Sequence, residues 1–332
     1  MTTHKGLTAV ITGVAGQDGS YLSELLLSKG YTVIGITRRK STYLCIDNVL
    51  HLLPNDNFKI IYGDILDPTL ISRVLHDYQP HEWYNLAAMS NVGQSFCEPQ
   101  LTFRVNSEAV INQLELIRQF SPSTRFYQAS TSEMWGGIGC PNSGYTEDSP
   151  FHPRSPYGVS KVAAYWSVIN YREAYDIFAC NGMLFNHSSP RRGHDFATRK
   201  ITSGVASVKL GLKSEVRMGN LEAFRDEGHS KDFVKAMWMM LQQDSPDDYL
   251  ISTGTGATIK EMFEYVCSLA ELNFSDIYRE DSRFMRPSEV LFLRGDPSKA
   301  SDKLGWSSNY DWKKLLEEMY LSDIGSLKRI IK

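Results

Sequence analysis

The feature that most constrains the fold of this chain is a glycine-rich turn near the N-terminus. The apolar run Leu7–Thr12 leads into TGVAGQDG (12–19), in which three glycines are spaced three residues apart. Such a turn lets the backbone approach a diphosphate, and the helix that follows offers free N–H groups and its positive end. A tight turn without a ligand is the alternative, but a strand before and a helix after favour a dinucleotide site. The predicted contact residues are Gly13, Gly16, Gln17, Asp18 and Gly19.

Short apolar runs alternate with helical patterns over the first 190 residues. The runs are Leu7–Thr12, Tyr31–Thr37, Phe58–Tyr62, Glu82–Ala88, Arg125–Ser130 and Ile177–Phe185. Several are apolar almost throughout, as strands covered on both faces should be. This alternation predicts an α/β fold with a doubly wound parallel sheet of the Rossmann type.

The pattern changes after Pro190, where polar and glycine-rich stretches separate isolated helices. These helices are predicted at Thr198–Leu210, Ser230–Gln243, Ile259–Ala270 and Trp312–Tyr320. We therefore predict a nucleotide-binding domain over residues 1–189 and a smaller mixed α/β substrate domain over 190–332. Part of 220–255 is allowed to return to the first domain, because chains of this type can cross between domains more than once.

Composition excludes several classes of protein. Lys and Arg number 35 against 38 Asp and Glu, so the net charge of −3 argues against an electrostatic nucleic-acid binder. No apolar run reaches the ~18 residues of a membrane helix. The five cysteines lie at least 40 residues apart and the histidines have no metal-ligand spacing, so we expect no metal. A cytoplasmic enzyme without a membrane or nucleic-acid partner is expected.

The end of the second predicted strand indicates which nicotinamide dinucleotide would bind. An NAD site places an acid there, but this chain has Thr37 followed by Arg38, Arg39 and Lys40. Cations at this position suit a 2′-phosphate, so we predict NADP, with a solvated basic loop as the alternative. Further predicted cofactor contacts follow the third and fourth strands: Asp64, Ile65, Leu86, Ala87, Ala88 and Ser90.

Tyr157 and Lys161 are spaced four residues apart, on one face of a predicted helix. A free phenol has a pKa near 10 and is a poor base at neutral pH. A nearby ammonium favours the phenolate, so we expect Lys161 to lower the pKa of Tyr157. Tyr157 would then take a proton from an alcohol while hydride leaves the same carbon.

Three polar residues, Thr131, Ser132 and Glu133, follow the fifth predicted strand, at the edge of the sheet where ligands bind. Glu133 lies 24 residues before Tyr157. A simple alcohol dehydrogenase needs no carboxylate here, so Glu133 suggests a second proton transfer at a neighbouring carbon. The alternative is a surface acid that caps a helix.

With these motifs in place, the chain resembles the extended short-chain dehydrogenase/reductases and, among them, the GDP-mannose 4,6-dehydratase family. The resemblance covers nearly the whole chain, and the later motifs are more specific than the glycine loop. The matching segments are TGVAGQDGSYL (12–22), YNLAAMSNVGQSF (84–96), ASTSEMWG (129–136), PFHPRSPYGVSK (150–161), NYREAY (170–175), CNGMLFNHSSPRRG (180–193), TRKIT (198–202), GNLEAFRDEGHSKDFVKAMWMMLQ (219–242), RPSEV (286–290) and GDPSKA (295–300).

The resemblance implies a redox-neutral elimination on a GDP-hexose. Tyr157, helped by Lys161, would deprotonate the 4-hydroxyl as hydride passes to NADP. Glu133 would remove the acidified C5 proton, and water would leave C6 with help from Glu133 and Thr131. Hydride would return to C6, giving a GDP-4-keto-6-deoxyhexose.

The resemblance also implies ligand contacts beyond those that the residues themselves suggest. His187 and Arg192 match positions that contact NADP in the family. The substrate side is expected to use Asn186, Lys200, Arg217, Asn220, Arg225, Arg286 and Glu289.

The chain departs from the family pattern around the sugar pocket. Ser188 replaces a usual Glu, Glu227 replaces a usual Trp, and Trp135 stands where Tyr or Phe is more usual; His194-Asp195 also differs. These changes leave the reaction type intact and keep other substrates open, such as a GDP-heptose.

Two further hypotheses are an NADP-dependent nucleotide-sugar reductase or epimerase and a binding protein that has lost its chemistry. Glu133 counts against the first, while Tyr157 and Lys161 count against the second. A homo-oligomer, either a dimer or a tetramer, is expected, in which the loop 38–57 reaches a neighbouring cofactor site and packs its apolar residues Leu44, Cys45 and Ile46 on the partner.

Overall fold

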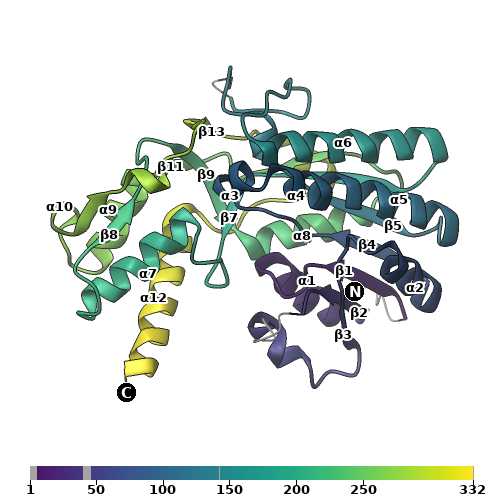
Figure 1. The fold of residues 1–332 in the computed structure, drawn as a ribbon, viewed down its shortest axis with the longest axis horizontal. Coiled ribbons are helices and arrows are strands. Elements are labelled where there is room, and N and C mark those ends of the chain that lie inside the picture. Colours follow the sequence, from purple (N-terminus) through teal and green to yellow (C-terminus); the bar gives the residue numbers. More distant parts are fainter. Residues whose placement is uncertain (1–5, 40–45, 142, 332) are drawn as a thin grey trace.

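A seven-stranded parallel sheet forms the centre of the larger domain in the computed structural model, which describes residues 6–39, 46–141 and 143–331 (Figure 1). The strand order is β10-β6-β5-β4-β1-β2-β3, so the doubly wound topology predicted from the sequence is confirmed. The strands are β1 (Thr8–Thr12), β2 (Thr32–Thr37), β3 (Phe58–Tyr62), β4 (Glu82–Asn85), β5 (Arg125–Thr131), β6 (Ala179–Leu184) and β10 (Tyr249–Ile251). The side chains of β6 are all buried, as expected for a strand with helices on both faces.

Helices cover both faces of this sheet. One face carries α1 (Gln17–Ser28), α8 (Ser230–Leu241) and α11 (Ser298–Leu304), and the other carries α2 (Pro68–Tyr78), α5 (Ala109–Phe120) and α6 (Pro156–Tyr175). The short helices α3 (Val92–Cys97) and α4 (Pro99–Phe103) lie beside α6. Helix α6 begins with a side-chain cap: Ser155 accepts a hydrogen bond from the Gly158 N–H, and Pro156 occupies the first turn.

The chain returns to the larger domain after it has entered the smaller one. Strand β9 (Phe224–His229) belongs to the smaller domain, but α8 directly after it packs against α1, and β10 pairs in parallel with β6. Helix α11 then packs against α8 and β10. The returning segments are therefore α8 to β10 and, in addition, α11.

The smaller domain, at the left in Figure 1, consists of two small sheets and four helices. One sheet joins β9 to β7 (Asn186–Ser188), β11 (Gly256–Thr258) and β13 (Phe292–Leu293), and the other joins β8 (Val216–Met218) to β12 (Tyr278–Glu280). The helices are α7 (Ala197–Lys209), α9 (Ile259–Leu269), α10 (Phe274–Ile277) and α12 (Trp312–Ile331). The predicted end of the last helix at Tyr320 is wrong, because Ile324 and Leu327 continue its apolar contacts with the domain core.

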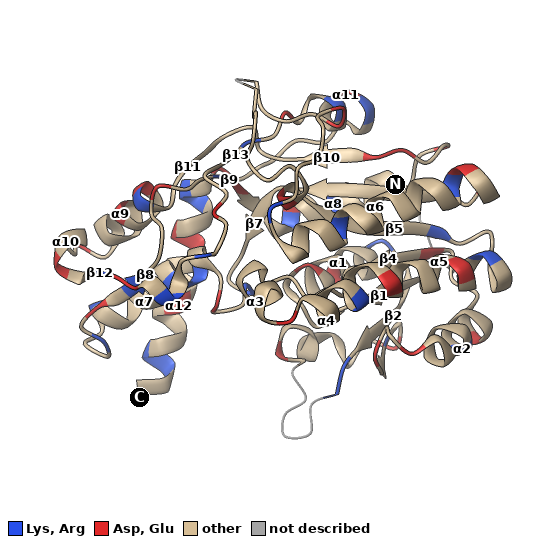
Figure 2. Cartoon of the chain, turned by 45° about the horizontal axis from the view of Figure 1, so that its top comes forward, with Lys and Arg blue, Asp and Glu red and all other residues tan. Residues whose placement is uncertain are grey.

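Charged residues of both signs are interspersed along the helices of both domains (Figure 2). Over the residues that the structure describes, no helix combines the length and the apolar character needed to cross a membrane.

Candidate functional site

A cavity of about 630 Å³ opens at the carboxyl ends of β1, β2, β4 and β5. The parallel sheet places its ligand crevice at this edge, where the strand order reverses. Most of the predicted site residues meet here: Gly13, Gly16, Gln17, Asp18, Gly19, Arg38, Asp64, Ile65, Leu86, Ala87, Ala88, Ser90, Thr131, Ser132, Glu133, Tyr157, Lys161, Asn186, His187, Arg192 and Arg286.

The glycine turn is built for close approach of backbone to backbone. Gly13 has φ +70°, and a Cβ there would lie 2.9 Å from the Ala87 nitrogen. A Cβ on Gly19 would lie 2.4 Å from the Gly13 oxygen. With any side chain at position 19, the turn could therefore not pack against the start of α1. No side chain caps α1 at Gly16, which leaves the first N–H groups of the helix available to a ligand.

Helix α6 brings Tyr157 and Lys161 to the cavity wall. Both side chains are buried, and the Lys161 Nζ donates a hydrogen bond to the Ala129 carbonyl at 2.6 Å. The ammonium lies 5.9 Å from the centre of the Tyr157 ring. The predicted spacing therefore does place phenol and ammonium together.

The acidity of this pair differs from the sequence-based expectation. Burial raises the pKa of Tyr157 to about 12, although the Thr131 hydroxyl donates a hydrogen bond that acts in the opposite direction. Burial also lowers the pKa of Lys161 to about 8. The expected lowering of the Tyr157 pKa is wrong for the protein alone: burial is the largest cause and raises the pKa, and Lys161 is not among the groups that shift it.

Glu133 lies on a single 3₁₀ turn, Ser132–Met134, that begins where β5 ends. Only 8% of the residue is exposed, so the alternative of a surface helix-capping acid is wrong. Its carboxylate lies 3.4 Å from the Arg286 guanidinium, which approaches from the smaller domain. Trp135, directly after this turn, stacks on Tyr145 and Phe185 in a buried aromatic cluster. This cluster supports the turn that holds Glu133.

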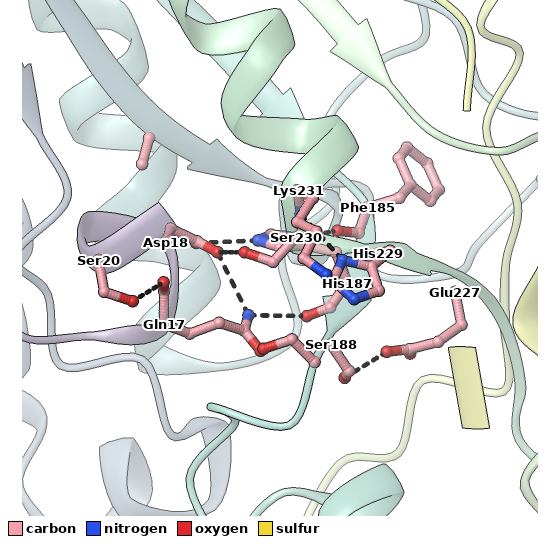
Figure 3. Close-up of polar contacts among 12 residues, drawn as sticks. Gln17, Asp18, Ser20, Phe185, His187, Ser188, Glu227, His229, Ser230 and Lys231 are labelled. Atoms are coloured by element: carbon pink, nitrogen blue, oxygen red, sulfur yellow. Dashed lines mark hydrogen bonds and ion pairs between the residues drawn. The ribbon is translucent and has the colours of Figure 1, made fainter. Parts of the chain in front are cut away.

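Asp18 and His187 form an ion pair between α1 and β7 (Figure 3), with the Asp18 Oδ2 2.9 Å from the His187 Nε2. The Ser230 hydroxyl donates a hydrogen bond to the other carboxylate oxygen at 2.5 Å. Burial alone would raise the pKa of Asp18, but these partners lower it to about 2. The charge of Asp18 in turn raises the pKa of His187 despite its burial. The pair joins the glycine turn to the segment that enters the smaller domain.

A second pocket of about 530 Å³ lies in the smaller domain and contains Lys200 and Arg217. Lys200 Nζ sits 3.6 Å over the ring of Phe284, and Arg217 contacts Glu215 at 2.6 Å.

The remaining predicted substrate residues line neither of these pockets. Asn220 accepts the Glu222 N–H, and Glu289 accepts the Arg286 N–H. Arg225 is buried and donates to the backbone oxygens of Phe224 and Val290. None of these three residues is among those that line the two cavities.

Sequence reasoning missed Phe196, which lines the cavity, and Asn106, which follows the cavity residue Val105. Asn106 lies on a π-turn, Arg104–Glu108, and bonds both to the Met89 backbone and to the Ser160 hydroxyl. It thereby joins the loop after β4 to α6. Phe196 lines the cavity beneath the Arg192 guanidinium, at 3.6 Å. A lone Asn or Phe carries no pattern, but the π-turn marks a functional position once it is seen.

The loop 38–57 is described only in part. Arg38 lines the cavity, whereas Lys40, Leu44 and Cys45 lie outside the described residues. Ile46, expected to pack on a partner subunit, is wrongly predicted: it is 3% exposed and belongs to the core between α1 and β3 of its own chain.

Two departures from the family pattern lie in direct contact. The Ser188 hydroxyl on β7 donates a hydrogen bond to the Glu227 carboxylate on β9, at 2.5 Å. Both residues are buried, behind the cavity wall that carries His187 and Arg192.

Comparison with solved structures supports the fold. The chain is similar to a dTDP-glucose 4,6-dehydratase from Bacillus anthracis in complex with NAD, with a TM-score of 0.85, 21% identity, and coverage of 98% of this chain and 100% of that one. A UDP-glucose 4-epimerase from Thermotoga maritima with UDP-glucose gives a TM-score of 0.84, 22% identity, and coverage of 98% and 100%.

Sequence comparison is more specific. The chain is 42% identical to a GDP-mannose 4,6-dehydratase of Vibrio cholerae, over 97% of this chain and 95% of that protein. It is 44% identical to GDP-mannose 4,6 dehydratase 2 of Arabidopsis thaliana (97% and 88% covered) and 41% identical to the human GDP-mannose 4,6 dehydratase (95% and 91% covered). The profile of the GDP-mannose 4,6 dehydratase family matches residues 10–319. The chain, with its buried Tyr157, Lys161 and Glu133 at one cavity, therefore belongs to the GDP-mannose 4,6-dehydratase family.

Proposed function

We propose that this protein converts GDP-mannose to GDP-4-keto-6-deoxymannose with a bound NADP. The observation that carries the proposal is the buried carboxylate of Glu133 at the same cavity as Tyr157 and Lys161. A phenol and a hydroxyl are enough to oxidise or epimerise an alcohol. A third group that can accept a proton provides for elimination at the neighbouring carbon.

The cavity fits a dinucleotide. The turn at Gly13, Gly16 and Gly19 leaves no room for side chains and leaves the N–H groups of α1 uncapped. The Arg192 Nε is buried with no hydrogen-bond partner among the described residues, as expected of a group that awaits an anionic ligand. When bound, an oxidised nicotinamide would bring a positive charge into the cavity, accept hydride from the sugar C4 and return it to C6 after water has left, with a proton added back at C5.

The chain's own groups then move the protons. Tyr157 takes the proton of the 4-hydroxyl, with Thr131 already hydrogen-bonded to the phenol, and Lys161 supplies the local cation. Glu133 takes the C5 proton, which the 4-ketone makes acidic, and returns it to the departing 6-hydroxyl so that water leaves. One carboxylate can serve as base and then acid because the two steps follow each other on adjacent carbons.

The substrate would extend from this cavity into the smaller domain. Arg286 reaches Glu133 from that side, and the second pocket holds Lys200 and Arg217 beside the exposed ring of Phe284. Guanidinium and ammonium groups suit a diphosphate, and an aromatic face suits a base. The GDP-mannose that the relatives' names specify supports this assignment.

The activity is tested with Glu133→Gln and Tyr157→Phe, each incubated with GDP-mannose and NADP. We expect wild type to form a product that has lost one water. Glu133→Gln should still reduce the nicotinamide but lose water about 10²–10⁴-fold more slowly, and Tyr157→Phe should lose both steps. Glu147→Gln, a partly buried acid whose carboxylate accepts the Leu250 N–H away from the cavity, is the matched control. Water loss at the wild-type rate in Glu133→Gln would refute the assigned base.

NADP, as distinct from NAD, is proposed from the end of β2. Arg38 lines the cavity there, and Arg39 lies 5.9 Å from the centre of the Tyr62 ring. The residues that follow Thr37 are Arg38 and Arg39, so this position has no acid that could hold the ribose hydroxyls of NAD.

We also propose a cytoplasmic homo-oligomer, either a dimer or a tetramer. Its support is a set of exposed apolar side chains on α4, α5 and α6, namely Leu101, Phe103, Ile111, Val159 and Trp166. Trp166 is 57% exposed although a helical pattern of apolar residues includes it. The four described cysteines are free, which suits a reducing compartment. Sedimentation velocity at micromolar concentration should show no stable monomer.

A further inference from the structure

A chain of buried side-chain hydrogen bonds crosses three neighbouring strands, β1, β4 and β5. Its members are Thr12, Asn85 and Gln128. The Thr12 hydroxyl lies 2.7 Å from the Asn85 Oδ1, and the Asn85 Nδ2 lies 2.8 Å from the Gln128 Oε1. The Gln128 Nε2 in turn donates to the Ala129 carbonyl at 3.1 Å, and this carbonyl is also the acceptor of Lys161. The proposed chemistry gives no role to Asn85 or Gln128.

The Thr12 hydroxyl determines which way each amide in this chain points. Its oxygen accepts the first two backbone N–H groups after β4, each at 3.1 Å, so its single proton goes to the Asn85 Oδ1. The Asn85 Nδ2 must then donate to the Gln128 Oε1, which leaves the Gln128 Nε2 directed at the Ala129 carbonyl. Gln128 therefore acts as a donor at this carbonyl.

The Ala129 carbonyl is available to side chains because the ladder between β4 and β5 stops beside it. The last paired residues are Asn85 and Gln128. Continued in the same register, the ladder would join the Ala87 N–H to the Ala129 carbonyl. That N–H bonds to the Thr12 hydroxyl, so the carbonyl is left to its two side-chain donors.

Lys161 therefore shares its acceptor. A carbonyl oxygen has two lone pairs, and the Gln128 amide uses one of them. The amide hydrogens carry partial positive charge and approach the same oxygen as the ammonium, which lies 2.6 Å from it. This arrangement confines the ammonium to one place and opposes its charge. Burial acts in the same direction and lowers the pKa of Lys161 to about 8.

We propose that Gln128 is a positioning residue for Lys161: by sharing the Ala129 carbonyl, it holds the ammonium beside Tyr157 and makes its proton easier to release. Gln128 is not among the residues that line the cavity, so it acts only through Lys161. The inference rests on the proposed function for the step that uses this proton, in which Tyr157 deprotonates the sugar hydroxyl.

The first test needs no substrate and uses urea unfolding of ligand-stripped protein at several pH values. Four proteins are compared: wild type, Lys161→Met, Gln128→Met and the double variant. Relative to Lys161→Met, the free energy of unfolding of wild type should increase above pH 8, as the folded chain releases the Lys161 proton. In the Gln128→Met background the ammonium has the carbonyl to itself, so its pKa should rise by about one unit. The increase between pH 8 and 9.5 should then fall to about half.

Gln113→Met is the matched control. Gln113 is a buried glutamine whose amide accepts the Trp83 indole N–H on β4 and donates to the Ala109 carbonyl. Its replacement removes comparable hydrogen bonds and leaves the acceptor of Lys161 untouched. In the Gln113→Met background, the increase due to Lys161 should equal that of wild type.

A shorter amide keeps the test decisive if Gln128→Met does not unfold cooperatively. Gln128→Asn retains a polar group in the core, but its side chain is one methylene shorter. It can bond to Asn85 or reach the Ala129 carbonyl, and it cannot do both. The increase due to Lys161 should fall in this variant as well.

The second test measures the rate at which GDP-mannose reduces bound NADP in a single turnover, followed by the absorbance of the nicotinamide. A pKa of Lys161 that is higher by about one unit should slow this step about tenfold in Gln128→Met at pH 7. At pH 9.5 the rates of the two proteins should approach each other, because the proton is then released in both. A defect of packing alone would slow the step by the same factor at every pH.

The inference is overturned if the folded Gln128 variant keeps the wild-type increase in the free energy of unfolding, or if Gln113→Met loses as much of it. Slowing of nicotinamide reduction by one constant factor over the whole pH range would also overturn it. Failure of wild type to reduce NADP with GDP-mannose would instead refute the proposed activity, and the unfolding test would still decide the role of Gln128.

Discussion

Residue by residue, the site places ionisable groups where solvent cannot stabilise their charge. Lys161 is 3% exposed, and its ammonium donates a hydrogen bond to the Ala129 carbonyl. Burial lowers its pKa from 10.5 to about 8. A lysine near this value is still mostly protonated at neutral pH, yet it can release a proton easily if the phenol of Tyr157 takes one from the sugar. Burial of the Lys161 ammonium also lowers the free energy of unfolding, because the charged group has lost its contact with water.

That cost gives a prediction about pH. Below pH 8 both folded and unfolded chains carry the Lys161 proton, so the penalty of the buried charge is fully present. Between pH 8 and 10.5 the folded chain has released it and the unfolded chain has not, so stability rises with pH. We expect the free energy of unfolding of wild type, relative to Lys161→Met, to increase by about 2 kcal/mol from pH 8 to pH 9.5.

Urea unfolding of ligand-stripped protein at several pH values measures this difference. All other titrating groups are common to the two proteins and cancel in the comparison. Lys299→Met, in which the lost ammonium is 30% exposed beside Asp247, is the control and should run parallel to wild type over this range. Parallel curves for Lys161→Met would show that its pKa is not lowered.

At the scale of elements, our proposal is that the end of β2 determines which dinucleotide the crevice accepts. Arg38 follows the last residue of β2 and lines the cavity. A 2′-phosphate would pair with its guanidinium, whereas the ribose hydroxyls of NAD prefer an acid. We expect Arg38→Asp to weaken NADP binding by about 100-fold, which is about 2.7 kcal/mol, and to leave NAD binding equal or tighter.

Titration of both dinucleotides into the variant checks this prediction. Lys59→Asp is a matched control, because it makes the same charge change on the neighbouring strand β3, where Lys59 lies over Tyr78. Both affinities should be nearly unchanged in that control. An equal loss of NAD and NADP affinity in Arg38→Asp would mean that Arg38 contacts a part common to both dinucleotides.

The elements also show where prediction from the sequence ends. Strands β1 to β6 were predictable because each coincides with a short apolar run in the sequence, and β3 has the predicted bounds. Strand β10 has only three residues, which is too few for a periodic pattern. The sequence therefore indicated that part of 220–255 could rejoin the larger domain, but it did not identify β10 as a strand of the large sheet. The glycine turn and the Tyr157–Lys161 spacing are local signals. The Ser188–Glu227 contact and the Phe196 platform depend on strand register and on packing between distant segments, which a single sequence does not display.

On the scale of the whole molecule, the two domains share a chain that passes between them five times: before β7, before α8, after β10, before α11 and after α11. Strand β10 completes the large sheet, and α8 and α11 pack beside it, although all three follow the smaller domain's strands β7 to β9 in the sequence. The active cavity lies where these crossings occur, with Asp18 and His187 joined across the first of them. The relative placement of Glu133 and Arg286 is therefore tied to the folding of both domains.

This arrangement predicts that residues 1–189 do not fold alone. The fragment lacks Phe233, Met237, Met240, Leu241 and Trp306, all buried in the core beneath α1. Each such side chain contributes about 1.5–3 kcal/mol by burial, so their combined loss is comparable to the stability of a whole domain, about 5–15 kcal/mol. It also leaves β6 as an open edge, with six buried residues and no β10 beside it. We expect the fragment to be insoluble or to lack a cooperative urea transition, and co-expression of residues 190–332 to restore solubility and dinucleotide binding. A soluble 1–189 with a cooperative transition and wild-type affinity for NADPH would show that the returning segments are dispensable for the larger domain.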